Sequence, residues 1–304
     1  MLQDVVSNIE KVIIGKRPEI ERVLCAILCG GHVLIEDMPG VGKTSLVSAI
    51  ARSFDCSFKR IQFTPDILPS DITGFSMFNQ KTSDFEFHPG AIMSQIILAD
   101  EINRTSPKMQ SSLLEVMEEG QVTVDGQTHK LPSPFIVFAT QNPVEYLGTY
   151  PLPEAQLDRF FMKLSLGYPT FEQESLMLQN VGRGVSLNEI APVASAAELL
   201  EAQEAVKQIH VHREVVDYIV SVINFTREHE ATVLGASPRA SICLYKAAQA
   251  VAYYQNRTFA TPDDVQAMAT HVLAHRLVLT QDSHYKKQTA ESIIQDALRT
   301  LKTP

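Results

Sequence analysis

A glycine-rich segment, DMPGVGKTS, runs from Asp37 to Ser45 directly after the apolar run Val33–Ile35. Between a strand and a helix, such a loop aims several backbone N–H groups at one point, where the helix N-terminus adds about half a positive charge. Lys43 supplies a full positive charge for the β- and γ-phosphates of a nucleotide, and the Thr44 hydroxyl can bind Mg²⁺. The residues that we expect to bind the nucleotide in this loop are Pro39, Gly40, Val41, Gly42, Lys43, Thr44 and Ser45.

Asp37 stands where phosphate-binding loops usually carry glycine. Aspartate tolerates a left-handed backbone better than most residues, so the turn can still form. We expect its carboxylate to point away from the phosphates.

Two carboxylates, Asp100 and Glu101, follow the apolar run Ile96–Ala99. Asp100 can hold Mg²⁺ directly or through water, and Glu101 can orient and deprotonate an attacking water. Acids after a strand often merely begin a loop. Their combination with a phosphate-binding loop favours nucleotide hydrolysis.

Three further polar residues could complete such a site. Asn142 follows the expected strand Phe135–Ala139 and can place an amide near the γ-phosphate, although an Asn-Pro turn is also common for local reasons. Arg159 lies just before the last expected strand, where an arginine could reach a neighbour's γ-phosphate and accelerate hydrolysis about 10³–10⁵-fold. Arg239 lies in the first turn of a helix begun by Ser237 and Pro238, where the helix dipole disfavours a cation and an opposing anion would offset that cost. The alternative for Arg239 is an ordinary solvated arginine.

Apolar runs separated by helical patterns must position these side chains. The expected strands are Val33–Ile35, Phe58–Phe63, Ile96–Ala99, Phe135–Ala139 and Phe161–Leu164. Continuous apolar runs of this kind predict a parallel sheet covered on both faces. The third strand is followed by a helix that Ser106 caps, Pro107 begins and Gly120 ends, and Asp125-Gly126 predicts a hairpin after it.

Strand patterns fade after Pro169, and helical patterns replace them. The expected helices are Ala197–Ile209, Arg213–Glu228, Pro238–Tyr254, Pro262–His275 and Ala290–Leu301. We therefore predict an α/β nucleotide-binding core over residues 1–168, with five parallel strands between helices, and a smaller all-α lid domain over residues 169–304. Pro169 and the stretch Gly182–Gly184 are candidate hinges.

Composition limits the class of protein. The 304 residues carry a net charge of −9, which argues weakly against a dedicated nucleic-acid binder. We see no secretory signal, and the most apolar stretch, Val23–Ile35, is too short to span a bilayer. The four cysteines form no CxxC pair, which favours buried free thiols in a reducing compartment, and we expect a cytoplasmic protein.

The ordered motifs together resemble the MoxR family of AAA+ ATPases over nearly the whole chain. They are Gly30–Thr44, Phe63–Gly74, Phe85–Gly90, Ile97–Gly126, Phe138–Pro143 and Pro151–Phe160. A phosphate-binding loop alone is shared by many enzymes, but this ordered set is highly specific.

The resemblance implies ATP and Mg²⁺ as cofactors and gives each candidate residue a role. It implies that Lys43 and Thr44 form the Walker A element and that Asp100 and Glu101 form the Walker B element. Asn142 corresponds to the first sensor, Arg159 to a finger acting on the neighbouring subunit, and Arg239 to the second sensor on the lid. Arg104 is a further candidate for facing a neighbour.

The resemblance also implies a homo-oligomeric ring, most often hexameric, that remodels or activates a partner complex and in some cases helps insert a metal or cofactor. Typical partners carry a von Willebrand factor type A domain. The segments Phe63–Gly90 and Val122–Leu131 would project toward the ring pore or the client.

Three alternatives remain at this point. One is a magnesium-chelatase-type motor subunit. A second is a nucleic-acid motor, which would need basic pore loops, whereas these two segments offer mainly Lys81, His129 and Lys130. The third is a nucleotide-binding switch that hardly turns over, against which Glu101, Asn142 and Arg159 argue.

Overall fold

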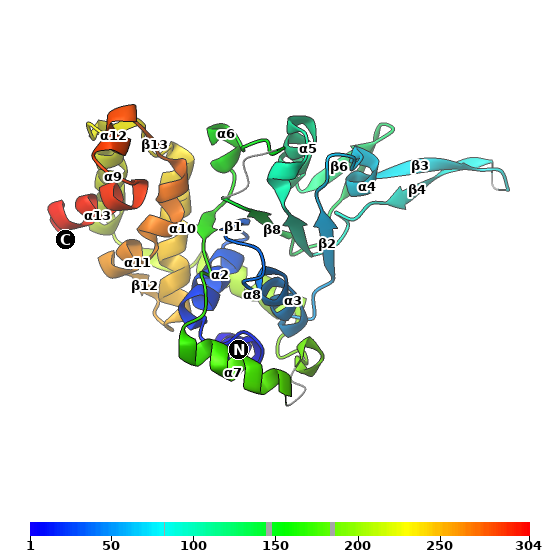
Figure 1. Cartoon of the computed structure of the whole chain (residues 1–304), viewed down its shortest axis with the longest axis horizontal. Helices are drawn as coiled ribbons and strands as arrows, with labels where there is room; N and C mark the ends of the chain where they lie inside the picture. The colour runs from blue at the N-terminus through cyan, green and yellow to red at the C-terminus, as the bar shows by residue number, and fades with distance from the viewer. Residues whose placement is uncertain (82, 144–147, 183–185) are drawn as a thin grey trace. The chain divides into compact units, whose positions relative to one another are not determined.

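The structure, a computed structural model, describes residues 1–81, 83–143, 148–182 and 186–304. Its centre is a five-stranded parallel sheet with the strand order β2-β5-β8-β1-β9. Figure 1 labels β1, β2 and β8 of this sheet. The strands are β1 (Val33–Glu36), β2 (Phe58–Gln62), β5 (Ile96–Asp100), β8 (Ile136–Gln141) and β9 (Met162–Leu164). The predicted fold class, a parallel sheet with helices followed by a helical lid, is confirmed.

Burial explains the apolar character of the inner strands. Every residue of β5 is buried, as are the first five residues of β8, because helices cover both faces of a parallel sheet. The edge strand β2 differs, since Lys59, Arg60 and Gln62 are exposed. Charged side chains on an edge strand oppose pairing with another chain, and here they also lie beside the carboxyl end of β5.

The helices agree with the sequence pattern where their ends are marked. The helix α5 (Pro107–Glu119) begins at Pro107 and ends at Gly120, whose φ of 62° is the left-handed conformation that closes many helices. Ser106 occupies the N-cap position, but its side chain makes no capping hydrogen bond. The other helices of the first two thirds of the chain are α1 (Leu2–Glu10), α2 (Arg17–Leu28), α3 (Lys43–Ser53), α4 (Pro69–Thr73), α6 (Glu154–Leu157), α7 (Phe171–Gly182) and α8 (Ala196–Val206).

The C-terminal helices match their predicted bounds closely. They are α9 (Arg213–Glu228), α10 (Pro238–Tyr254), α11 (Pro262–Leu273) and α13 (Ala290–Thr300). A 3₁₀ turn, Ala274–Arg276, follows α11, and a short helix that was not predicted, α12 (Gln281–Tyr285), precedes α13. The expectation that strands end after Pro169 is incomplete. Two small sheets pair β10 (His210–Val211) with β12 (Phe259–Ala260) and β11 (Thr232–Leu234) with β13 (Val278–Leu279), and strands this short leave no alternating pattern.

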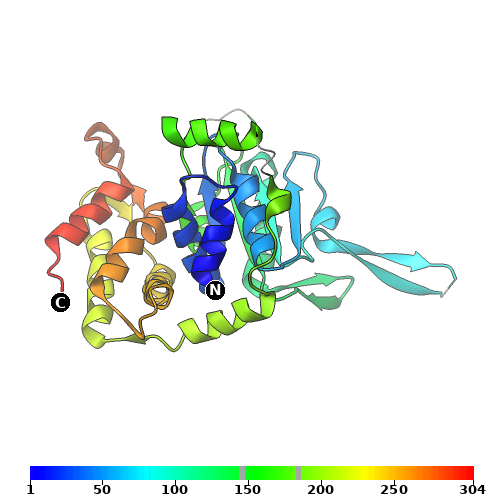
Figure 2. The ribbon, with the colours of Figure 1, turned by 90° about the horizontal axis from the view of Figure 1, so that it is seen from below.

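Two antiparallel hairpins interrupt the α/β succession. The predicted one consists of β6 (Gln121–Val124) and β7 (Gln127–Lys130), with positive φ at both Asp125 and Gly126 as a type I′ turn requires. The other consists of β3 (Gly74–Asn79) and β4 (Asp84–Pro89), and Figures 1 and 2 show it extending away from the sheet. Close backbone contact anchors its base, because a Cβ at Gly90 would lie 2.1 Å from the carbonyl oxygen of Ile72.

The chain forms two compact units. Unit 1 contains Met1–Ile20, Leu34–Leu152 and Ser165–Leu200, and unit 2 contains Glu21–Val33, Pro153–Leu164 and Glu201–Pro304. The predicted domain boundary after residue 168 stays a prediction, as does a hinge at Pro169. Residues 183–185, which overlap the predicted Gly182–Gly184 hinge, lie outside the described residues.

Two expectations from composition can be compared with the described residues. Among them, no helix has the length and apolar character needed to cross a membrane. The four cysteines are free thiols, of which Cys25 is buried and the other three are partly exposed. Burial raises the pKa of the Cys25 thiol to about 12, so it is an inert apolar side chain at neutral pH.

Candidate active site

A cavity of about 360 Å³ in unit 1 brings together most of the residues that the sequence singled out. Its lining comprises Pro39, Gly40, Gly42, Lys43, Thr44, Ser45, Arg60, Asp100, Glu101 and Asn142. Among the described residues, Val41 is not part of this lining. The phosphate-binding loop and the acidic pair, which are about 60 residues apart in the sequence, therefore face the same space.

Glycine shapes the phosphate-binding loop. Gly40 and Gly42 have φ values of 85° and 93°, which other residues rarely adopt. Gly42 is the N-cap of α3 and makes no side-chain capping bond, so the first backbone N–H groups of α3 are left for another acceptor. The ammonium of Lys43 donates to the carbonyl oxygen of Asp37 at 2.8 Å, which holds the side chain back over the loop.

Asp37 anchors the segment that follows β9. Its carboxylate accepts hydrogen bonds from the Ser165 hydroxyl at 2.8 Å and from the backbone N–H groups of Leu166 and Gly167. The carboxylate thus binds residues 165–167. The left-handed backbone that we considered for Asp37 is not used, since this residue is absent from the described residues with positive φ.

The acidic pair is held by a neighbouring threonine. The Thr140 hydroxyl donates to Asp100 Oδ1 at 2.6 Å and accepts from the backbone N–H of Glu101 at 2.9 Å. Glu101 has a φ of 57° and a ψ of 49°, a left-handed conformation that is uncommon for a residue with a long side chain. Strain of this kind concentrates at functional sites, where the surrounding contacts enforce it.

Two residues of the edge strand β2, which the sequence reasoning missed, bind both carboxylates. Arg60 donates to Asp100 Oδ2 from Nε at 3.0 Å and from Nη2 at 2.6 Å. Gln62 accepts from Arg60 at 2.7 Å and donates to Glu101 Oε2 at 2.7 Å. The signal in the sequence was two polar residues, two positions apart, at the carboxyl end of a strand, which places them on the same face.

Two opposing effects act on the pKa of Lys43 in the cavity. Partial burial lowers the pKa of the Lys43 ammonium from its ordinary value. The nearby carboxylates, Asp37 first, act in the opposite direction, and phosphate groups in the cavity would do the same.

The donors present fit a magnesium ion. Mg²⁺ prefers oxygen ligands, usually one or two carboxylates together with water and substrate phosphates. The Thr44 hydroxyl and the Asp100 carboxylate are donors of this type and line the same cavity. Asp100 Oδ2 also carries the Arg60 ion pair, so Mg²⁺ and Arg60 would share one carboxylate.

Two of the predicted site residues belong to unit 2. Arg159 lies between α6 and β9, and Arg239 lies in the first turn of α10, which the Ser237 hydroxyl caps through the backbone N–H of Ala240. The approach of either arginine to the cavity stays a prediction. Arg104 pairs with Glu101 of its own chain at 3.4 Å, and its facing a neighbour also stays a hypothesis.

Comparison with known proteins gives a consistent result. Residues 32–162 match the model of the ATPase family associated with various cellular activities (AAA), and residues 224–297 match the AAA lid domain. The chain is 49% identical to the uncharacterized protein YeaC of Bacillus subtilis, over all of this chain and 95% of that protein. It is 41% identical to the chaperone MoxR1 of Mycobacterium tuberculosis, over all of this chain and 82% of that protein.

A crystal structure of a Cytophaga hutchinsonii protein is also similar. It is 38% identical in sequence and superposes with a TM-score of 0.92, over 99% of this chain and 94% of that one. At this identity and coverage the likeness extends over both the core and the lid.

The contacts of Asp37 lead to a prediction about stability. Replacing Asp37 by alanine leaves the Leu166 and Gly167 N–H groups without their acceptor, so we expect the free energy of unfolding to fall by about 3 kcal/mol. Urea unfolding followed by circular dichroism measures it. Asp37→Asn, which keeps one acceptor oxygen, should lose less, and Asp296→Ala on the exposed face of α13 should lose almost nothing. Equal losses in Asp37→Ala and Asp37→Asn would contradict the anchoring role.

Proposed function

Since the chain belongs to the MoxR family of AAA ATPases, we propose that it hydrolyses ATP in a homo-oligomeric ring, in the cytoplasm, to remodel or activate a partner protein complex. The observation that carries the proposal is the single cavity that contains the phosphate-binding loop, both carboxylates and Asn142. A cavity with these groups can both hold a triphosphate and position a water molecule against it.

Each residue of the cavity has a distinct part in this reaction. The N–H groups at the start of α3 and the Lys43 ammonium bind the β- and γ-phosphates. Glu101 orients the attacking water and accepts its proton, and Asn142 donates an amide hydrogen bond near the γ-phosphate. Thr44 and Asp100 would hold Mg²⁺, which when bound neutralises charge on the phosphate oxygens.

The proposed ring follows from the role of Arg159. An arginine that acts on the ATP of the neighbouring subunit makes hydrolysis depend on assembly, and head-to-tail interfaces close into rings. Arg239, at the start of α10, would bind the phosphates of its own subunit and release them after cleavage. A rigid-body movement of the lid is then the mechanical output.

The partner is proposed to be a protein with a von Willebrand factor type A domain, and the β3–β4 hairpin offers a surface for it. Phe75, Met77, Phe78 and Phe85 are 48–68% exposed. At the base of the hairpin, Phe87 stacks on His129 of the second hairpin, with ring centroids 3.8 Å apart. An exposed apolar patch of this kind is typical of a protein-binding surface.

Turnover should depend on Glu101. Glu101→Gln keeps the shape of the side chain but removes the base, so we expect ATP hydrolysis to fall by roughly 10²–10⁴-fold while ATP binding is retained. Steady-state phosphate release and binding of a fluorescent ATP analogue measure the two effects. Glu201→Gln, on the exposed face of α8, is the matched control. If the wild-type chain is no faster than Glu101→Gln, the protein is a nucleotide-binding scaffold and the proposal fails.

Mixing two inactive variants tests whether Arg159 acts on the neighbouring subunit. Arg159→Ala should bind ATP but lose most of its turnover. In rings mixed one to one with Glu101→Gln, about a quarter of the interfaces combine an intact Glu101 with a neighbour's intact Arg159, so about that fraction of wild-type activity should return. No recovery in mixtures shown by light scattering to co-assemble would mean that Arg159 acts within its own subunit.

The hairpin surface can be tested with the Glu101→Gln variant, which should stay bound to its client in ATP. We expect a protein with a von Willebrand factor type A domain to be retained, and the additional changes Phe75→Ser and Phe85→Ser to abolish its retention, because they remove exposed apolar area. Affinity capture followed by mass spectrometry measures this. Phe171→Ser, which removes an aromatic of α7 that is 84% exposed, is the control. Retention unchanged by the hairpin variants would exclude the hairpin as the contact.

A further inference from the structure

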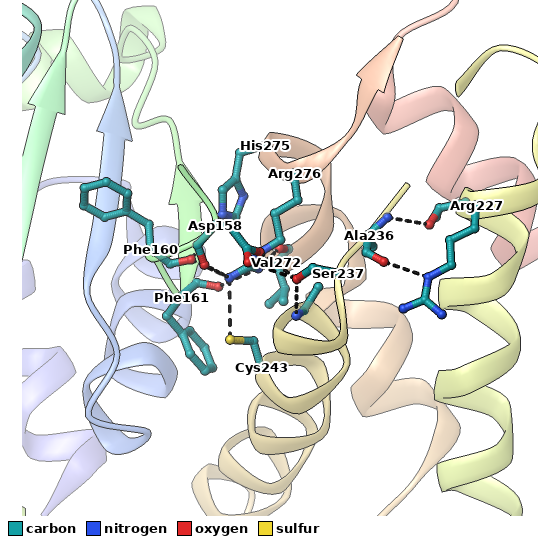
Figure 3. Close-up of polar contacts among 12 residues, drawn as sticks. Asp158, Phe160, Phe161, Arg227, Ala236, Ser237, Cys243, Val272, His275 and Arg276 are labelled. Carbon is teal, nitrogen blue, oxygen red and sulfur yellow. Dashed lines mark hydrogen bonds and ion pairs between the residues drawn. The ribbon is translucent and has the colours of Figure 1, made fainter. Parts of the chain in front are cut away.

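One buried guanidinium in unit 2 binds the main chain on both sides of Arg159. Arg276, whose side chain is 1% exposed, donates to the carbonyl oxygens of Phe160 at 2.6 Å and Phe161 at 3.3 Å (Figure 3). It also donates to the carbonyl oxygen of Asp158 at 3.3 Å and, from Nε, to the Asp158 carboxylate at 2.8 Å. The backbone at three of the four residues 158–161 is therefore fixed to the turn that follows α11.

A histidine beside Arg276 adds to this attachment. His275 Nε2 lies 3.2 Å from the carbonyl oxygen of Phe160. Burial lowers the pKa of His275 well below its ordinary value, so the ring is neutral and donates through Nε2–H. The fifth N–H of Arg276, on Nη1, donates to the carbonyl oxygen of Val272, and Nη2 also lies 3.5 Å from the Cys243 sulfur, so the guanidinium has little freedom to move.

The same carboxylate binds the start of α10. The Ser237 hydroxyl lies 2.9 and 3.0 Å from the two carboxylate oxygens of Asp158, to which it donates. Its oxygen also accepts from the backbone N–H of Ala240, so one side chain both caps α10 and binds Asp158. Arg239 lies in the helical turn that is capped in this way.

The turn before α10 is fixed from its other side as well. Arg227 Nε donates to the carbonyl oxygen of Ala236 at 2.9 Å (Figure 3). The buried Thr226 hydroxyl accepts from the N–H of Ala236 at 3.1 Å. A Cβ at Gly235 would lie 2.6 Å from the Cα of Arg227, so this turn packs directly on α9. Ser237 therefore cannot follow a displaced Asp158 without disturbing α9.

We propose that Asp158, Ser237 and Arg276 are positioning residues that join Arg159 and Arg239 into one rigid group. The proposal rests on the function proposed above, in which Arg239 contacts the ATP of its own subunit and Arg159 contacts that of the neighbour. Joined in this way, the two arginines move together. A change in one nucleotide site then displaces the arginine that serves the next site.

An ion pair whose arginine is buried and whose carboxylate is only 22% exposed is a costly way to obtain stability alone. Removing two charges from water offsets most of their attraction, and apolar residues of similar size often stabilise a fold equally well. The Arg276 fork instead supplies several directional bonds from one planar group. Fixed geometry next to Arg159 is the property that an apolar replacement could not provide.

To test the positioning role, Ser237→Ala is introduced into a subunit whose own ATP site is inactive. In the mixture of Glu101→Gln with Arg159→Ala, the Glu101→Gln subunit contributes Arg159 to its neighbour and hydrolyses nothing itself. Adding Ser237→Ala to that subunit should lower the recovered activity by at least about tenfold, because small misplacements of a reacting group cost this much. Adding it to the Arg159→Ala subunit should instead raise the KM for ATP.

Two controls separate positioning from folding. Ser237→Thr keeps the hydroxyl and should restore the recovered activity. Thr289→Ala removes a comparable hydroxyl cap from α13, where Thr289 accepts from the N–H of Ser292, and should leave the activity unchanged. Arg276→Lys in the Glu101→Gln subunit should act like Ser237→Ala, and if it does not fold, the Ser237 variants decide alone.

The outcomes distinguish the two proposals. Full recovery with Ser237→Ala in the Glu101→Gln subunit, or an equal loss with Thr289→Ala, would overturn the positioning role. If the parent mixture itself recovers no activity, the action of Arg159 on a neighbour fails first.

Discussion

The proposed hydrolysis depends on placing a polyanion beside two carboxylates. At an effective dielectric constant of 20, two like charges 4 Å apart repel by about 4 kcal/mol, so phosphates can approach Asp100 and Glu101 only if positive charge lies close by. Lys43, Arg60 and the first N–H groups of α3 supply it within the same cavity. Arg60 is already bound to Asp100, which means that the carboxylate is partly neutralised before any metal arrives. The exposed, charged edge strand beside β5 therefore supplies positive charge for the proposed reaction and also opposes pairing of the sheet with another chain.

The sequence predicts the fold best where one local signal fixes a boundary. Pro238 and Gly120 mark helix ends because proline and glycine restrict or release the backbone, and the runs at β5 and β8 are apolar because both faces of each strand are buried. The β3–β4 hairpin escaped prediction for a physical reason. Its connecting residues lack an Asn-Gly or Asp-Gly pair, and although polar and apolar residues alternate in β4, β3 has apolar side chains on both faces, so the two runs do not share the alternation that identifies a two-stranded ribbon.

The residues of the candidate site that follow strand ends were predictable from the sequence. The contacts made by the edge strand β2 were not. Lys43, Thr44, Asp100, Glu101 and Asn142 lie where strand ends and a glycine-rich loop predict them. Which edge residue meets which carboxylate depends on register. In the structure Gln62 is opposite Asp100 and Arg60 is opposite Leu98, yet Arg60 binds Asp100 and Gln62 binds Glu101. Each β2 side chain thus binds a carboxylate that lies beyond its partner in the ladder. Sequence alone does not predict this, because the pairing of β2 with β5 is a tertiary contact.

Segments outside helices and sheets have no ladder to satisfy their backbone groups, and side chains must do so instead. Asp37 serves this purpose for the N–H groups of residues 166 and 167, and Arg276 serves it for the carbonyl groups of residues 158, 160 and 161. In each case the charged group is buried and multiply bonded, which fixes the backbone in one conformation. The first loop is bound by Asp37, whose carbonyl oxygen accepts from the Lys43 ammonium. The second loop contains Arg159. At these two places a buried charge thus fixes irregular backbone next to a cation of the proposed site, since there a defined position matters more than the cost of desolvation.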